Sequence, residues 1–103
     1  MNNEQFEIEM EKSFLRSKQI LRKKKLEYAS STDRLHNFKQ TAAMEDKYPT
    51  ETLFSMADKH IASIATMVKQ PLNYTFKQWH EKTVDLRNYT ILLEAVLVDI
   101  GVE

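Results

Sequence analysis

Hydrophobic residues recur at helical spacing along the first quarter of the chain. Intervals of four and seven residues place five of them on one stripe of a helix over residues 4–28. These five are Phe6, Met10, Phe14, Leu21 and Tyr28. A weaker stripe of Ile8, Leu15 and Leu26 lies roughly opposite, and it must meet another helix of the chain or another subunit. Acidic residues lead this helix and basic residues trail it, which we attribute to the helix dipole.

A polar stretch then separates this helix from the second long one. Asp33 is the expected N-cap of a short helix over residues 33–45, and Tyr48-Pro49 breaks the chain before a long helix over residues 51–69. Thr50 is the expected cap of that long helix. Its expected inward face consists of Leu53, Ala57, His60, Ile61, Ile64 and Val68.

The last long helix is expected over residues 76–100. Thr75 or Asn73 is its expected N-cap, and Gly101 follows it as a left-handed C-cap residue. Between Tyr89 and Val98 the sequence is apolar on nearly all sides of the helix, which places this segment at the centre of the fold. The sequence therefore predicts an all-α fold, a compact bundle of three long helices and one short helix, completed by dimerisation.

Composition narrows the class of protein further. The 103 residues fit one domain, residues 1–103, and the absence of cysteine excludes disulfides and thiolate zinc sites. A single glycine excludes the glycine-rich phosphate loops of P-loop and dinucleotide-binding proteins. Fifteen basic residues balance fifteen acidic ones, so nucleic-acid binding is disfavoured despite the run at residues 22–25. With no apolar stretch of membrane-spanning length, we expect a cytoplasmic protein.

The candidate chemistry lies in the last long helix. Glu81, Asp85 and Asn88 are spaced i, i+4 and i+7, so they share one face, which leans toward the interior. Buried carboxylates need a cation, and Mg²⁺ with a phosphate-bearing substrate would supply one. The alternative is a structural polar network, in which Lys59, Arg34 or His60 provides the positive charge.

Several short motifs in order resemble one family. Lys25-x-x-Tyr28-Ala29, Asp33-Arg34-Leu35-x-Asn37-Phe38 and Met56-x-Asp58-Lys59 precede Glu81-x-x-x-Asp85-x-x-Asn88-Tyr89-x-x-Leu92-Leu93. This layout, covering roughly residues 22–94, resembles the phage and prophage MazG-like, nucleotide-modification-associated proteins. The resemblance implies an all-α, Mg²⁺-dependent nucleoside triphosphate pyrophosphohydrolase that completes its bundle with a second subunit. The family's Glu-x-x-Glu pair is replaced here by a stretch with one carboxylate, Asp58, and Lys59.

The resemblance also implies roles for individual residues. Glu81, Asp85 and Asp58 would hold the metal, and Glu81, Asp85 and Lys59 would serve catalysis. The expected substrate-binding residues are Tyr28, Arg34, Asn37, Lys39, His60 and Asn88. Two alternatives remain: a nucleotide-binding protein without turnover that sequesters a nucleotide signal, and a phage accessory protein that binds a host protein.

Overall fold

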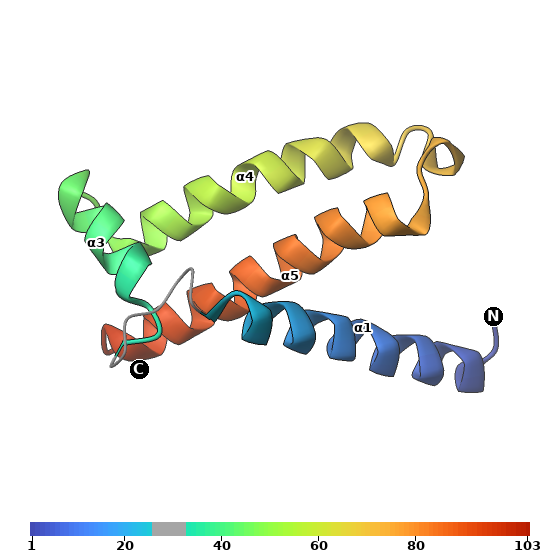
Figure 1. Ribbon diagram of the computed structural model, residues 1–103, viewed down its shortest axis with the longest axis horizontal. Helices are drawn as coiled ribbons and strands as arrows, with labels where there is room; N and C mark the ends of the chain where they lie inside the picture. The colour runs from blue at the N-terminus through green and yellow to red at the C-terminus, as the bar shows by residue number, and fades with distance from the viewer. Residues whose placement is uncertain (26–32) are drawn as a thin grey trace.

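The described part of the chain is helical throughout. A computed structural model describes residues 1–25 and 33–103, and these ranges contain helices and no strand. The helices are α1 (Asn3–Lys23), α3 (His36–Met44), α4 (Pro49–Met67) and α5 (Phe76–Asp99), with a 3₁₀ turn η1 at Pro71–Asn73 (Figure 1). The predicted all-α fold with three long helices and one short helix is confirmed. No helix in the described ranges has the length and apolar character needed to cross a membrane.

Local hydrogen bonds explain where the helices begin. The Asn2 side chain accepts from the Gln5 N–H of α1, and Thr75 Oγ1 accepts from the Gln78 N–H of α5, each within a capping box. Thr75 is thus the cap that the sequence predicts. Thr50, by contrast, lies inside α4, because Pro49 takes the first helical position, for which its fixed φ is suited.

Asp33 lies before α3 and is not its N-cap, contrary to expectation. Its Oδ1 accepts the Leu35 N–H at 2.9 Å, two residues on, so it forms a turn before the helix. The helix itself begins at His36 with Leu35 as N-cap. The expected start at residue 33 is therefore displaced by three residues.

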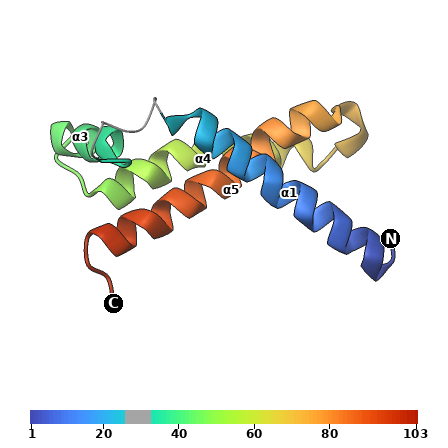
Figure 2. The ribbon, with the colours of Figure 1, turned by 60° about the horizontal axis from the view of Figure 1, so that its bottom comes forward.

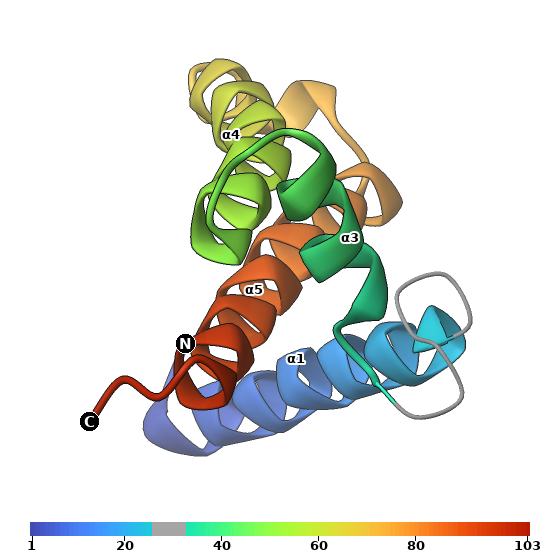
Figure 3. The same ribbon diagram turned by 90° about the vertical axis from the view of Figure 1, so that its left-hand side faces the viewer.

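Helix α5 lies between the other two long helices. It packs against α4 on one side and α1 on the other, while α3 packs on α4 (Figure 3). The central position predicted for α5 is confirmed. The best-buried side chains, Phe38, Leu53 and Val96, come from α3, α4 and α5 and form one core with Leu35 and Leu92.

The burial pattern of α1 differs from the predicted main stripe. Phe6 and Phe14 are more than half exposed, whereas Ser17 is buried. Figure 2 shows why: α1 crosses α5 obliquely, and its N-terminal half projects past the crossing. At the crossing, Ser17 contacts Arg87 and Asn88 of α5, and Leu21, one turn further along α1, packs against the core. The weaker stripe residues Ile8 and Leu15 are exposed as well, and Leu26 lies outside the described residues.

Five further apolar positions differ from expectation. On α4, Ile61 is exposed and Met67 is buried, and Val68, directly after the helix, is exposed, because the face that meets α5 is narrower than the predicted stripe. On α5, Ile91 and Val98 are exposed, because α4 and α3 cover only one side of its C-terminal half. The radius of gyration, 15.6 Å, exceeds the ~13 Å typical of a compact domain of this length.

Candidate functional site

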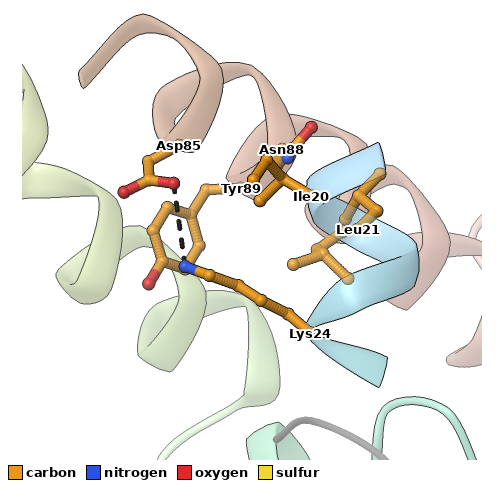
Figure 4. Close-up of a pocket in the computed structure, with 7 residues that line it drawn as sticks. Ile20, Leu21, Lys24, Asp85, Asn88 and Tyr89 are labelled. Carbon is orange, nitrogen blue, oxygen red and sulfur yellow. Dashed lines mark ion pairs between the residues drawn. The ribbon is translucent and has the colours of Figure 1, made fainter. Parts of the chain in front are cut away.

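The central carboxylate of the predicted site is Asp85, and it lies between two positively charged or chargeable groups. Its Oδ1 is 3.7 Å from Lys24 Nζ, and its Oδ2 is 3.8 Å from His60 Nε2 (Figure 4). Lys24 follows α1 directly and His60 comes from α4, so all three long helices meet here. The His60 ring also lies 5.5 Å from the Tyr89 ring. The structure therefore favours the polar-network interpretation for Asp85.

Asn88 lies one turn further along α5 and joins that helix to α1. Its Nδ2 donates to the Ser17 carbonyl at 3.2 Å, and the side chain is buried. The neighbouring Arg87 donates to Ser17 Oγ at 2.8 Å and to the Ser13 carbonyl at 3.3 Å. Asn88 is thus placed as a structural link between helices.

Burial controls the charge of the two histidines on this side of the fold. Desolvation lowers the pKa of His60, and the charge of Asp85 opposes that effect only in part. Desolvation, with Arg16 nearby, also lowers the pKa of His80. Both imidazoles are therefore neutral at pH 7, and the ion pair of Asp85 at that pH is the one with Lys24.

Beside Asp85 the structure has one very small cavity and one large groove. The cavity, shown in Figure 4, has a volume of about 10 Å³, enough for a single water molecule. The groove lies between α1 and α5 and has a volume of about 700 Å³. Its charged lining residues are Arg16, Lys23, Lys24, Lys77, Glu81 and Asp85. We call this feature the basic groove, since four basic residues face two acidic ones in a chain of zero net charge.

Three of the predicted substrate-binding residues lie on α3 or just before it: Arg34, Asn37 and Lys39. Arg34 donates to the Leu21 carbonyl at 2.6 Å, and Lys39 lies 2.8 Å from Asp33 and 2.7 Å from Asp99. The hydrogen bond from Lys39 lowers the pKa of Asp33. These contacts tie α3 to α1 and α5, so Arg34 and Lys39 serve the fold. Asn37 is half-buried on the same helix.

The remaining predicted residues are dispersed. Asp58 and Lys59 are exposed on α4, and Glu81 is exposed on α5 where it borders the basic groove. Tyr28 lies outside the described residues. Among the residues in the ranges 1–25 and 33–103, no three His, Asp or Glu side chains are placed to hold a metal ion together. The residues expected to hold Mg²⁺ thus do not form a donor set, and we derive no metal-dependent step.

The residues that build the groove and the helix junction were not predicted from the sequence. Lys23 and Lys24 were counted among the trailing charges of the first helix, and Arg16, Lys77 and Arg87 were not considered. One usable signal was present: Ser13 and Ser17 interrupt the apolar stripe between Met10 and Leu21. Small polar residues at inward helix positions indicate a close, hydrogen-bonded crossing.

Comparison with known proteins returns no relative. No protein-family model matches the chain, and no curated protein or solved structure is significantly similar to it. The resemblance to MazG-like proteins therefore stays a prediction, and function must be argued from the groove and the surfaces described above.

Proposed function

We propose that this protein binds a nucleotide or a similar small phosphate-bearing molecule in the basic groove, and that it acts by binding without turnover. The observation that carries the proposal is the excess of cationic side chains in a groove of ligand size. Its volume of about 700 Å³ falls within the range of ~300–1,000 Å³ for small-molecule sites.

The groove offers different chemistry at its two walls. Lys23 on the α1 wall and Lys77 on the α5 wall take part in no ion pair between described residues, and ammonium groups are usual donors to phosphate oxygens. Arg16 and Lys24 also line the groove, but Arg16 is paired with Glu9 at 3.0 Å and Lys24 with Asp85 at 3.7 Å. Glu81, exposed on the α5 wall, is an acceptor for hydroxyl or amino groups. A ligand with an anionic end and a hydroxyl- or amine-bearing end matches both walls, and a nucleotide has both.

The contacts of Asp85 with Lys24 and His60 favour binding without turnover. The charge of Asp85 is already engaged by Lys24, and His60 lies on its other oxygen. A substrate could use this carboxylate as a general base only after displacing its contact with Lys24. Glu81 is then the one acid of the groove that a ligand reaches without displacing an ion pair between described residues.

Titration calorimetry with nucleoside mono-, di- and triphosphates, and with inorganic phosphate alone, tests the proposal. We expect saturable binding of at least one nucleotide that weakens as salt is raised. Because a hydrogen bond to a charged group contributes ~1.5–3 kcal/mol, the double variant Lys23→Gln/Lys77→Gln should weaken binding by tenfold or more. Lys69→Gln, an exposed lysine outside the groove, is the matched control and should leave affinity unchanged.

Three results would contradict this proposal. Absence of heat change and of thermal stabilisation at millimolar ligand would exclude nucleotides and similar phosphate-bearing molecules as ligands. Equal weakening by Lys69→Gln would mean that the interaction is general charge attraction. Release of pyrophosphate in the presence of Mg²⁺, lost in Glu81→Gln, would replace binding by hydrolysis.

A further inference from the structure

The outward face of α1 has an apolar centre that the chain itself leaves uncovered. Phe14 and Leu15 are 54% and 53% exposed. Leu15 lies on the side of α1 away from Ser17, the residue that is buried at the crossing with α5, and Phe14 lies at the edge of this outward side, three residues before Ser17. A large aromatic and a leucine side by side in water are a typical feature of a contact surface.

Charged residues flank this apolar centre in a mirrored order. On the N-terminal side, and at increasing distance from the centre, lie Glu11, Glu7 and Glu4; on the C-terminal side lie Lys18, Arg22 and Lys25. All six side chains are exposed. Five of them lie on α1 at intervals of three, four and seven residues, so these five share the outward face with Phe14 and Leu15, whereas Lys25 follows the end of the helix. Glu11 and Lys18 are equally far from a point between Phe14 and Leu15, as are Glu7 and Arg22.

The helix dipole accounts for only the outer part of this order, contrary to the expectation from the sequence. It acts on the first and last turns, where Glu4 and Arg22 lie, whereas Glu11 and Lys18 lie well inside α1. Within one helix the acids are neighbours of acids, and the bases neighbours of bases, which is unfavourable by a few tenths of a kcal/mol for each pair. No ion pair between described residues engages Glu11 or Lys18. When a second copy of the helix is laid alongside in the opposite direction, each acidic position therefore lies opposite a basic one.

We propose that α1 pairs in antiparallel orientation with α1 of a second copy of this chain, about a two-fold axis that passes between Phe14 and Leu15. Each acidic half then faces the partner's basic half, because the axis reverses the chain direction. At 1.5 Å per residue, the two charged pairs within α1, Glu11 with Lys18 and Glu7 with Arg22, lie about 5 and 11 Å from the axis along the helix. The two-fold axis repeats every pair, so the apolar centre is flanked by ion pairs at both ends.

The rest of the fold leaves room for this partner. Helix α1 packs against α5, and its N-terminal half projects from the molecule (Figure 2). The basic groove is lined by Arg16 and Lys23, which lie on a different side of α1 from the mirrored face. A second copy on the outward face therefore leaves the groove open, and the pairing does not depend on the proposed ligand.

Sedimentation velocity over 1–200 µM protein tests the pairing by charge reversal. We expect the parent chain to approach twice its mass of 12.2 kDa at the higher concentrations. Glu11→Lys and Lys18→Glu should each weaken association by tenfold or more, because each places like charges opposite each other twice per dimer. The double variant Glu11→Lys/Lys18→Glu should restore it, since both partners of each pair are inverted. Lys69→Glu makes the same charge change as Lys18→Glu at an exposed position in the turn after α4 and should have no effect.

Cross-linking tests the orientation, and the chain suits it because it has no cysteine of its own. An equimolar mixture of the Glu11→Cys and Lys18→Cys variants should form the mixed disulfide preferentially. A monomeric mass at 200 µM would overturn the proposal, as would failure of the double charge reversal to restore association. Preferential disulfide formation between two Glu11→Cys chains would indicate a parallel pairing and would equally overturn it.

Discussion

Polar side chains, more than apolar ones, fix the position of α1 on α5. Asn88 donates to the Ser17 carbonyl, and Arg87 donates to Ser17 Oγ and the Ser13 carbonyl. Because buried donors need acceptors at defined positions, these bonds select one crossing of the two helices. Two of the acceptors belong to the α1 backbone, so the junction depends on the side chains of α5.

Removal of the Asn88 side chain should reveal its structural role. Asn88→Ala deletes a buried donor and leaves a small cavity, so we expect a loss of about 1–3 kcal/mol in the free energy of unfolding. Urea denaturation monitored by circular dichroism gives that value. Asn73→Ala, on the exposed turn η1, should change stability by less than ~0.5 kcal/mol. A stable Asn88→Ala variant that has lost nucleotide affinity would instead support the ligand-contacting role implied by the resemblance.

The pH dependence of stability should report on His60. Burial lowers its pKa below the ordinary value of 6.5, so the unfolded chain binds a proton at a higher pH than the folded chain does. Stability is therefore greatest above pH 6.5 and falls as the pH drops from 6.5 toward the folded pKa. Unfolding midpoints measured between pH 7.5 and 5.5 should show this fall, and His60→Gln should reduce it. His36→Gln, an exposed histidine on α3, controls for the substitution.

The sequence correctly predicts that Asp85 and Asn88 share one face of the last helix, but it does not predict which residues they contact. Helical spacing determines which residues share a face, whereas the partner of each side chain depends on how the helices cross. Lys24 and Ser17 reach α5 only because α1 crosses it obliquely. A linear pattern contains no information on that angle, so the metal and substrate roles could not be tested without the fold.

At the level of the helices, hydrogen bonds at the N-termini decide where each element begins. Asn2 with Gln5, and Thr75 with Gln78, form reciprocal bonds at the starts of α1 and α5. Such boxes are visible in the sequence because they involve residues three apart. Helix bounds were therefore predicted to within a few residues for α4 and α5, whose predicted ranges were 51–69 and 76–100.

Loss of the Thr75 cap should destabilise the protein by about 1 kcal/mol. Thr75→Ala removes the oxygen that accepts the Gln78 N–H and leaves that donor to water. Thermal unfolding should show a lower midpoint for this variant. Thr66→Ala, an exposed threonine inside α4, is the matched control, and it should be neutral or slightly stabilising because alanine is the better helix former.

Which stripe of a helix is buried proved harder to predict than where the helix lies. The main stripe of the first helix was predicted from the spacing of its apolar residues, and two of them, Phe6 and Phe14, are exposed. The buried position is Ser17, which a scale of hydrophobicity ranks low. Size and apolarity favour burial on average, but close helix crossings select small residues.

The molecule as a whole is elongated, with extents of 44 × 28 × 28 Å. Its apolar core lies at one end, among α3, α4 and the C-terminal half of α5. The all-α class and the central position of α5 followed from the sequence, because both depend on periodicity and overall apolarity. The projection of α1 did not, because it depends on the polar junction.

Self-association predicts that thermal stability depends on protein concentration. A dimer that binds only folded chains raises the unfolding midpoint as concentration increases. We expect a measurable rise in midpoint between 5 and 200 µM for the parent chain. Phe14→Gln/Leu15→Gln should show a lower midpoint that does not change with concentration, because both side chains are exposed in the single chain and their loss leaves its core intact. A constant midpoint for the parent would argue against the dimer.

The polar junction at Ser17 also has a dynamic consequence. Helix α1 is held to the remainder by a few directional bonds, whereas α4 and α5 share an apolar core. Directional bonds fail together when one helix tilts, so α1 detaches at a lower free energy than global unfolding requires. Amide hydrogens in the N-terminal half of α1 should therefore exchange with solvent by local opening, long before those around Leu53 and Val96, and a second copy bound to α1 would slow that exchange.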